Sequence, residues 1–531
     1  MTRRDLAPIV RWETEEKADL LLNANKKEKP RDDFKLPRLH TRLKRRLEKL
    51  GVVDVGSNSV RLVIFDGAAR SPAYFFNEKI LCGLGAGVAE TGKLNPEGRA
   101  RALIALKRFA LLAETMKAEP LYCVATAAVR EAEDGPDFIK AVKKETGLKL
   151  KVASGEEEAR MSAMGVLLGW PTARGLMCDI GGSSMELAEI DNGEIGTCMT
   201  SSLGPQKLTG FADDASLCAE IARRVGALRE SFGKDYETLF LVGGSWRAIA
   251  RLDMERHDYP LKVLHEYAMT PDSAMETADW IGSHSVEELR ALTGSSQERM
   301  VLVPTAAKVL QELIRQFSPK QIATSSYGIR EGLLYSRMPT SLRRRDPLIE
   351  ACVHMERTSA RIPGFGKVLY EFLEPVFQEA SEDRKRLIKA ACLLHDVTWR
   401  AHPDYRAEVC FDNATRANLG GLDHAGRVFV AVSLLHRYKN SLPDTGFLGV
   451  VSLLNEEERQ AAEVLGKAMR FGAMLSGASA KMMCSLNYDK DNNLLELIMS
   501  PRTQDLFGEV VLSRFESLAN ALGATTKLTV S

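Results

Sequence analysis

Two stretches of the sequence, residues 54–59 and 179–184, repeat the pattern Asp-x-Gly-x-x-Ser after an apolar run. Glycine permits a left-handed backbone and lets a ligand approach closely, and successive amides in such turns form a nest for anions. Serine and asparagine side chains supply further hydrogen-bond donors. Two such turns facing each other would hold one phosphoryl group, through Gly56, Ser57, Asn58, Ser59, Gly181, Gly182, Ser183 and Ser184.

The aspartates that open the two copies point to phosphoryl chemistry, which depends mostly on positioning and on stabilising charge. Asp54 and Asp179 are expected to hold Mg²⁺ through water, because this ion gives up its hydration shell reluctantly. The alternative is two ordinary hairpins in which Asp and Ser only form the turns. The second copy, and a third glycine turn at residues 243–245, favour phosphate binding.

A run of acids at residues 156–158 follows Ser154 and has the form of a helix-starting capping box. Such acids could orient a water for attack on a phosphate. They could also be present because carboxylates stabilise the positive end of the helix dipole. The residues alone favour this second explanation.

The elements that must position these residues alternate as in layered α/β domains. Strand–turn–strand patterns cover residues 51–67 and 175–190, whereas residues 348–471 are almost wholly helical and the tail mixes strands with a helix. We therefore expect a charged N-terminal arm, two α/β domains, a helical domain and a small C-terminal α/β unit, over residues 1–49, 50–170, 171–340, 341–475 and 476–531. The arm reads either as a loosely attached segment or as a basic attractor of polyanions, and its mixed charges favour the first.

Bulk composition excludes several classes of function. The net charge of +1 argues against a protein-wide field for nucleic acid or membrane, so we expect neither partner. A polyanion would need a local basic path, and residues 343–345, Arg-Arg-Arg, are either such a path or a solvated linker. Nine cysteines without a CxxC pair indicate a reducing compartment, and no apolar stretch reaches about 20 residues, so we expect a cytoplasmic protein.

Taken together, six stretches resemble the exopolyphosphatase / guanosine pentaphosphate phosphohydrolase family of the actin–Hsp70–sugar kinase superfamily. They occur in family order between about residues 51 and 336: VVDVGSNSVRLVIFDG, VATAAVREAEDGPDFI, SGEEEARMSAMGV, CDIGGSSMELAEI, LVGGSWRAIARL and SSYGIREGLLY. The resemblance implies two RNase H-like domains with the active site in the cleft between them, and a homodimer. It implies that Glu158 is the catalytic base, that Arg130 meets phosphate, and that Asp179 and Glu186 flank the metal.

The sequence departs from the family pattern at two turns. Ser183 stands where the family usually has a third glycine, and Trp246 and Arg247 stand where smaller residues are usual. The latter turn is therefore expected to lose its usual contact with nucleotide or distal phosphate. Beyond residue 347 the chain resembles an HD-type domain through His395 and Asp396, but Gly366 stands where an upstream histidine is expected, so we expect no working metal site there.

The leading functional prediction is Mg²⁺-dependent release of terminal phosphate from inorganic polyphosphate. The second is hydrolysis of guanosine pentaphosphate, which the same turns could support. A kinase-like ATPase is disfavoured by residues 243–247 and by the resemblance of residues 154–160 to the hydrolases. A non-enzymatic polyphosphate or nucleotide sensor is disfavoured because Glu158 and both aspartates are present.

Overall fold

The structure is a computed structural model that describes residues 49–67, 70–441, 446–477, 482 and 484–530. All of these described residues belong to one compact unit. The predicted N-terminal arm lies outside the described residues, apart from its last residue. Within the described residues no helix is both long and apolar enough to cross a bilayer. All nine cysteines are free thiols.

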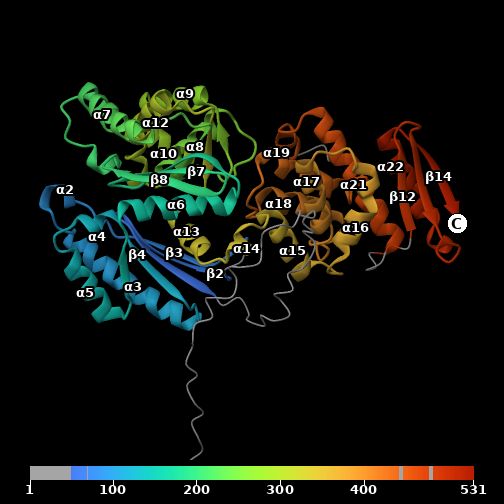
Figure 1. The fold of residues 1–531 in the computed structure, drawn as a ribbon, viewed down its shortest axis with the longest axis horizontal. Coiled ribbons are helices and arrows are strands. Elements are labelled where there is room, and N and C mark those ends of the chain that lie inside the picture. Colours follow the sequence, from blue (N-terminus) through green and yellow to red (C-terminus); the bar gives the residue numbers. More distant parts are fainter. Residues whose placement is uncertain (1–48, 68–69, 442–445, 478–481, 483, 531) are drawn as a thin grey trace, which may run out of the picture. The chain divides into compact units, whose positions relative to one another are not determined.

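The first sheet forms around the first glycine turn (Figure 1). Its order is β3-β2-β1-β4-β5, in which β1, β2 and β3 are antiparallel neighbours and β1, β4 and β5 run parallel. The apolar residues of one face pack against α3 and α5 in a common core. The bounds are β1 Leu50–Val55, β2 Ser59–Phe65, β3 Tyr74–Leu81, α2 Val88–Thr91, α3 Pro96–Thr115, β4 Leu121–Ala125, α4 Ala127–Glu131, α5 Gly135–Thr146 and β5 Leu150–Val152.

The second sheet repeats this arrangement with one more strand, in the order β10-β11-β9-β6-β7-β8. The antiparallel series β6, β7, β8 matches β1, β2, β3, and β9 and β11 again run parallel to the first strand. Helices α7 to α12 supply the core of its outer face. The bounds are β6 Arg174–Ile180, β7 Met185–Asp191, β8 Glu194–Ser201, α7 Asp214–Phe232, β9 Thr238–Gly243, α8 Gly244–Arg256, β10 Ala268–Met269, α9 Pro271–Gly282, α10 Val286–Thr293, α11 Gln297–Met300, α12 Val303–Phe317 and β11 Gln321–Ser325.

Between the inner faces of the two sheets lie the helices α6 (Gly155–Gly169) and α13 (Ile329–Ser336), whose apolar residues share one core with both sheets. The two helices touch through glycines. A Cβ on Gly332 would lie 1.6 Å from the carbonyl oxygen of Met161, and one on Gly165 would lie 2.3 Å from that of Gly328. Only glycine fits such an approach.

Strand alternation decides which polar side chains face this middle layer. In β1, Val53 and Val55 join the outer core while Leu50 and Val52 join the inner one, so Asp54 faces α6 and α13. The same alternation directs Asp179 inward. Pairing extends each aspartate into a row across its sheet: Asp54, Arg61 and Lys79 in the first, and Asp179, Glu186 and Thr200 in the second.

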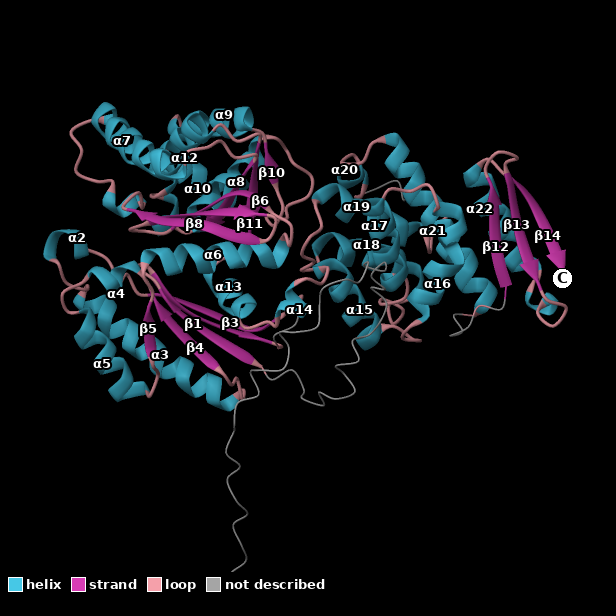
Figure 2. Cartoon of the chain, in the orientation of Figure 1, coloured by secondary structure: helices cyan, strands magenta, loops and turns pink. Residues whose placement is uncertain are grey.

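Beyond the two sheets, residues 347–476 contain only helices and loops among the part described (Figure 2). A three-stranded sheet follows, with β12 antiparallel and β14 parallel to β13, and α22 packs against α21 through Phe515 and Phe471 at 5.1 Å. The longer elements are α15 Pro347–Ser359, α16 Phe365–Leu373, α17 Glu382–Leu394, α18 Arg406–Arg416, α19 His424–His436, α21 Glu456–Ser476, β12 Cys484–Asp489, β13 Leu494–Met499, α22 Glu509–Leu522 and β14 Thr525–Val530.

The pair that suggested an HD-type domain is buried in this helical region. The carboxylate of Asp396 accepts two hydrogen bonds of 2.7 Å from the Arg361 guanidinium, and Nδ1 of His395 lies 2.8 Å from the carbonyl oxygen of Cys392. Gly366 is tightly enclosed, because a Cβ there would lie 2.7 Å from that same carbonyl oxygen. The carboxylate of Asp396 is thus already paired with the guanidinium of Arg361. The HD-like assignment stays a prediction.

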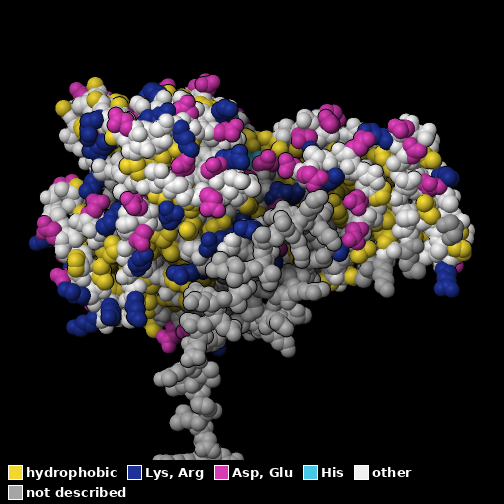
Figure 3. Space-filling model, viewed as in Figure 1, with side chains coloured by type: hydrophobic (Ala, Val, Ile, Leu, Met, Phe, Trp, Pro, Cys, Tyr) yellow, Lys and Arg dark blue, Asp and Glu magenta, His cyan; other side chains and the backbone are white. Residues whose placement is uncertain are grey.

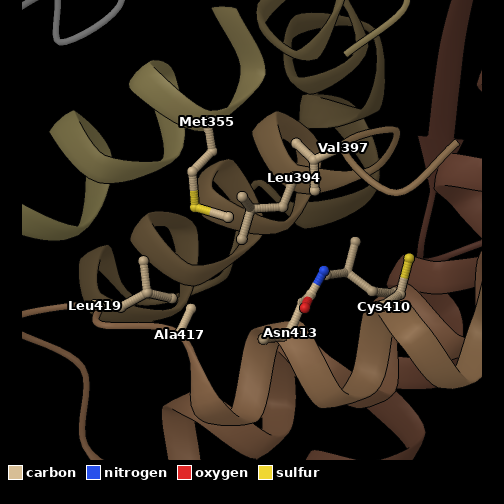
Figure 4. A pocket seen from close by; sticks show the side chains of 9 residues that line it. Met355, Leu394, Val397, Cys410, Asn413, Ala417 and Leu419 are labelled. Carbon is tan, nitrogen blue, oxygen red and sulfur yellow. The ribbon is translucent and has the colours of Figure 1, made fainter. Parts of the chain in front are cut away.

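A cavity in the same region is apolar and holds about 10 Å³, roughly the space of one water (Figure 4). It is too small for a phosphate. The residues around it are Met355, Leu394, Val397, Cys410, Asn413, Ala414, Ala417, Leu419 and Leu434. Arg343 and Arg345 of the linker have local partners, the carbonyl oxygen of Ser336 at 2.7 Å and the carboxylate of Glu350 at 3.3 Å. This arrangement favours the linker explanation over a polyanion path.

Candidate active site

The two repeated turns face each other, as the repeat predicted. The hydroxyl of Ser183 donates to that of Ser57 at 3.2 Å, so the copies meet through the serine that replaces a family glycine. Each turn is closed by the same backbone bond, from Gly56 to Ser59 at 3.0 Å and from Gly181 to Ser184 at 2.9 Å.

Amides in both turns are free to bind an anion. Within the described residues, the backbone N–H groups of Ser57, Asn58, Gly182 and Ser183 donate no hydrogen bond. Unpaired amides that converge on one space are suited to phosphate oxygens. Glycine permits a left-handed backbone, but none of Gly56, Gly181 and Gly182 has a positive φ in these turns. Gly182 leaves room for the side chain of Gln206, whose Oε1 lies 2.6 Å from a built Cβ.

The carboxylates of Asp54 and Asp179 lie at the inner ends of β1 and β6. Burial raises the pKa of both, and each is raised further by a neighbouring carboxylate, that of Asp179 acting on Asp54 and that of Glu331 acting on Asp179. The hydroxyl of Ser162, on α6, donates to Asp179 at 2.5 Å and fixes its orientation. Glu186 lies beside Asp179 in the sheet, and burial together with Glu158 and Asp179 raises its pKa well above the usual value.

Glu158 projects from the first turn of α6 into the same space. The predicted capping box is present: the hydroxyl of Ser154 accepts from the amide of Glu157, whose carboxylate accepts from the amide of Ser154. Glu157 thus completes the capping box, in which Glu158 takes no part. Burial raises the pKa of Glu158 to about 7, against the opposing effect of Arg130, whose guanidinium donates to it at 3.0 Å.

A carboxyl with a pKa near 7 is divided between its two protonation states at neutral pH, as a general base requires. Arg130 also donates to the carbonyl oxygen of Ala153 at 2.9 Å, so its guanidinium is anchored with donors to spare. Glu158, Arg130, Asp54, Asp179 and Glu186 therefore lie in one interacting group of charged side chains, which the family resemblance had implied. Their chemical roles stay predictions.

The carboxylates fit a hard divalent cation. Oxygen donors are the ligands Mg²⁺ prefers, and at these acids burial raises the pKa more than the neighbouring cations lower it. Across the described residues no three His, Cys, Asp or Glu side chains are grouped closely enough to chelate a metal by themselves. Mg²⁺ usually keeps several waters and takes the remaining ligands from the substrate phosphates, so the two observations are compatible.

Sequence reasoning missed a set of cations beside the site. Arg330, on α13, acts on both aspartates, and Arg247, on α8, acts on Asp179. Trp246 is fully buried in the outer core of the second sheet, so only Arg247 of that pair faces the site. The inward alternation of β2 could have revealed Arg61, but no local pattern joins residues from such distant elements.

A family model described as the Ppx/GppA phosphatase family matches residues 63–341, which is more than half of the chain. The chain belongs to the Ppx/GppA phosphatase family. A second model, exopolyphosphatase C-terminal, matches residues 359–529. The α/β part has the α/β fold of the Ppx/GppA family, with two mixed sheets, so the predicted fold class is confirmed for this part.

Individual relatives of this Ppx/GppA chain are distant. Exopolyphosphatase 1 of Mycobacterium tuberculosis is 26% identical over 332 residues, which cover 60% of the chain and 95% of the relative. Retrograde regulation protein 2 of Saccharomyces cerevisiae is 25% identical over 448 residues, 74% of the chain and 73% of that protein. The crystal structure of an exopolyphosphatase from Cytophaga hutchinsonii covers 54% of the chain and 97% of its own, at 24% identity and a TM-score of 0.50. This last likeness bears on the fold alone.

Proposed function

We propose that this Ppx/GppA protein is an exopolyphosphatase that releases terminal orthophosphate from inorganic polyphosphate. The observation that carries the proposal is Glu158, a buried carboxyl with a pKa of about 7, which Asp179 and Asp54 at the two turns raise further. The name of the mycobacterial relative and the C-terminal family model support the substrate.

In the proposed reaction the free amides of both turns hold the terminal phosphoryl group, and Arg130 orients it. Glu158 takes a proton from a water, whose oxygen bonds to the terminal phosphorus while the bridging anhydride bond breaks. The products are orthophosphate and a chain shorter by one phosphate. Mg²⁺, held by Asp54, Asp179 and Glu186, would neutralise charge on the phosphates.

The test is phosphate release from long-chain polyphosphate by the wild type and by Glu158→Gln, each with Mg²⁺ and with a chelator. We expect Mg²⁺-dependent release by the wild type, and a loss of at least about 100-fold in kcat in the variant, consistent with removal of a general base. The variant should still bind polyphosphate, because the amide keeps the shape of the side chain. Full activity of the variant would remove Glu158 from the mechanism.

Guanosine pentaphosphate is the second candidate substrate, because the matched family is named for both activities. Phosphate release from the two substrates at equal concentration separates these possibilities. A non-catalytic sensor remains the third candidate, and turnover of either substrate would exclude it. A cytoplasmic location and a homodimer stay predictions, to be checked by cell fractionation and light scattering.

A further inference from the structure

The first sheet continues its inward row from Asp54 through Arg61 to Lys79, whereas the second continues from Asp179 to Glu186 and Thr200. Cross-strand neighbours lie about 5 Å apart, so Arg61 and Lys79 lead away from the reacting centre as adjacent cations. The repeat therefore places cations on one sheet where it places acids on the other.

Helix α8 brings two further cations to the same region. Arg247 and Arg251 are four residues apart, so they lie on one face of the helix, about 6 Å apart along its axis. Arg247 donates to the carbonyl oxygen of Ser325 at 3.4 Å and acts on Asp179. Beside the start of α8 stands Arg299 of α11, whose Nε would be 3.4 Å from a Cβ on Gly244.

These cations repel one another, and at Arg247 the carboxylates of Asp179 and Glu331 offset the repulsion only in part. Across the described residues, none of Lys79, Arg247, Arg251 and Arg299 forms an ion pair. The nearby exposed Glu298, on α11, interacts with Lys79 only through space. Burial and the charges of Arg299, Arg61, Arg247 and Arg330 lower the pKa of Lys79 to about 8, and burial with Arg330 and Arg299 lowers that of Arg247 to about 10.

We propose that Lys79, Arg247, Arg251 and Arg299 form a second phosphate-binding site, the basic path, which binds the distal phosphates of a linear polyphosphate. The inference rests on the proposed function and deepens it. Arg247 stands where a small residue is expected after the third glycine turn, so this region would bind a chain of negative charges better than a neutral nucleoside. The basic path thereby favours long polyphosphate over both short chains and guanosine pentaphosphate.

The test compares chain lengths in Lys79→Gln, Arg247→Thr, Arg299→Gln and the triple variant. We expect the ratio of kcat/KM for long-chain polyphosphate to that for tripolyphosphate to fall about ten-fold or more for each arginine, as for loss of a charge-assisted hydrogen bond. The change should appear in KM. Lys320→Gln removes one charge before β11, at the opposite end of the second sheet, and should leave the ratio as in the wild type. An unchanged ratio in the triple variant overturns the proposal.

A binding experiment separates this inference from the proposed function. Calorimetric titration of long-chain polyphosphate into Glu158→Gln, with and without the three path substitutions, needs no turnover. The path substitutions should weaken binding at least about ten-fold and reduce its dependence on salt. If the wild type releases no phosphate but the path substitutions weaken binding, the proposed hydrolase activity is refuted and the basic path is supported. If polyphosphate binds equally well with and without the path substitutions, the basic path is refuted, whatever the activity. Thermal unfolding of each variant identifies those that fail to fold.

Discussion

At the scale of single residues, Glu158 shows what sequence reasoning could and could not supply. Its position at a helix start was visible, but a dipole-stabilising acid has the same pattern. The distinction depends on Arg130, 28 residues away, and on burial between two sheets, neither of which is encoded locally. Resemblance to the family supplied the assignment, whereas Glu157 has a different role, because its carboxylate accepts from the amide of Ser154 in the capping box.

Arg130→Gln tests the environment of Glu158. Arg130 lowers the pKa of Glu158 against burial, so its removal should raise that pKa further above about 7. A base must be deprotonated, so the acid limb of the profile of kcat/KM against pH should move to higher pH, by about one unit. Arg130→Lys should restore much of the shift. An acid limb that stays in place while kcat/KM falls would assign Arg130 to phosphate binding alone.

At the scale of elements, the regular strands and long helices were predictable because their apolar periodicity is strong. The strand–turn–strand predicted over residues 51–67 is β1 with β2, and that over residues 175–190 is β6 with β7. The third strand, β3, was missed because much of it is exposed and its pattern mixes aromatic, acidic and basic residues. The pairing of α6 with α13 was also beyond reach, since it depends on glycines 167 residues apart.

Gly332→Ala tests that helix pairing. The added methyl would overlap the carbonyl oxygen of Met161, at 1.6 Å, so α6 and α13 must separate. We expect a loss of at least about 2 kcal/mol in unfolding free energy, at the upper end for overpacked cores. Gly282→Ala is a matched control, because a Cβ there meets nothing within 4 Å. Equal melting temperatures for the two variants would contradict the tight contact.

At the scale of the whole molecule, the second α/β domain contacts the helical region through buried polar groups. No sequence motif predicted these contacts. The carboxylate of Glu266 accepts from the amide of Leu422 at 2.9 Å, and the hydroxyl of Tyr327 donates to Asn418 at 2.9 Å. Glu266 has a φ of 65°, an unfavourable value for a residue with a side chain. Tyr327 directly precedes the segment that carries Arg330. The contact between Tyr327 and Asn418 therefore links the helical region to the candidate active site. Charges of both signs are interspersed on the face drawn in Figure 3, in keeping with a net charge near zero.

Glu266 should make the stability of the protein depend on pH. Burial raises its pKa to about 7 from a usual value of 4.5. Between those values the folded state holds a proton that the unfolded state has released, so stability falls as pH rises from about 4.5 to 7. Glu266→Gln removes this loss, and its melting temperature should exceed that of the wild type at pH 8 but not at pH 4.5. The control Glu237→Gln, at an exposed residue, should give no gain in melting temperature at pH 8. If Glu266→Gln also gives no gain, the raised pKa of Glu266 is refuted.

The shared middle layer has a mechanical consequence. Because α6 and α13 are in contact through glycine backbones, they form a stiff connection between the two sheets. Glu158 lies on α6 and Arg330 lies on α13. At the mouth, the two turns are joined by a hydroxyl–hydroxyl bond between Ser57 and Ser183. Thermal motion that separates the two sheets should therefore be small along α6 and α13, where Glu158 and Arg330 lie, and largest at the two turns, where a phosphate would enter and leave.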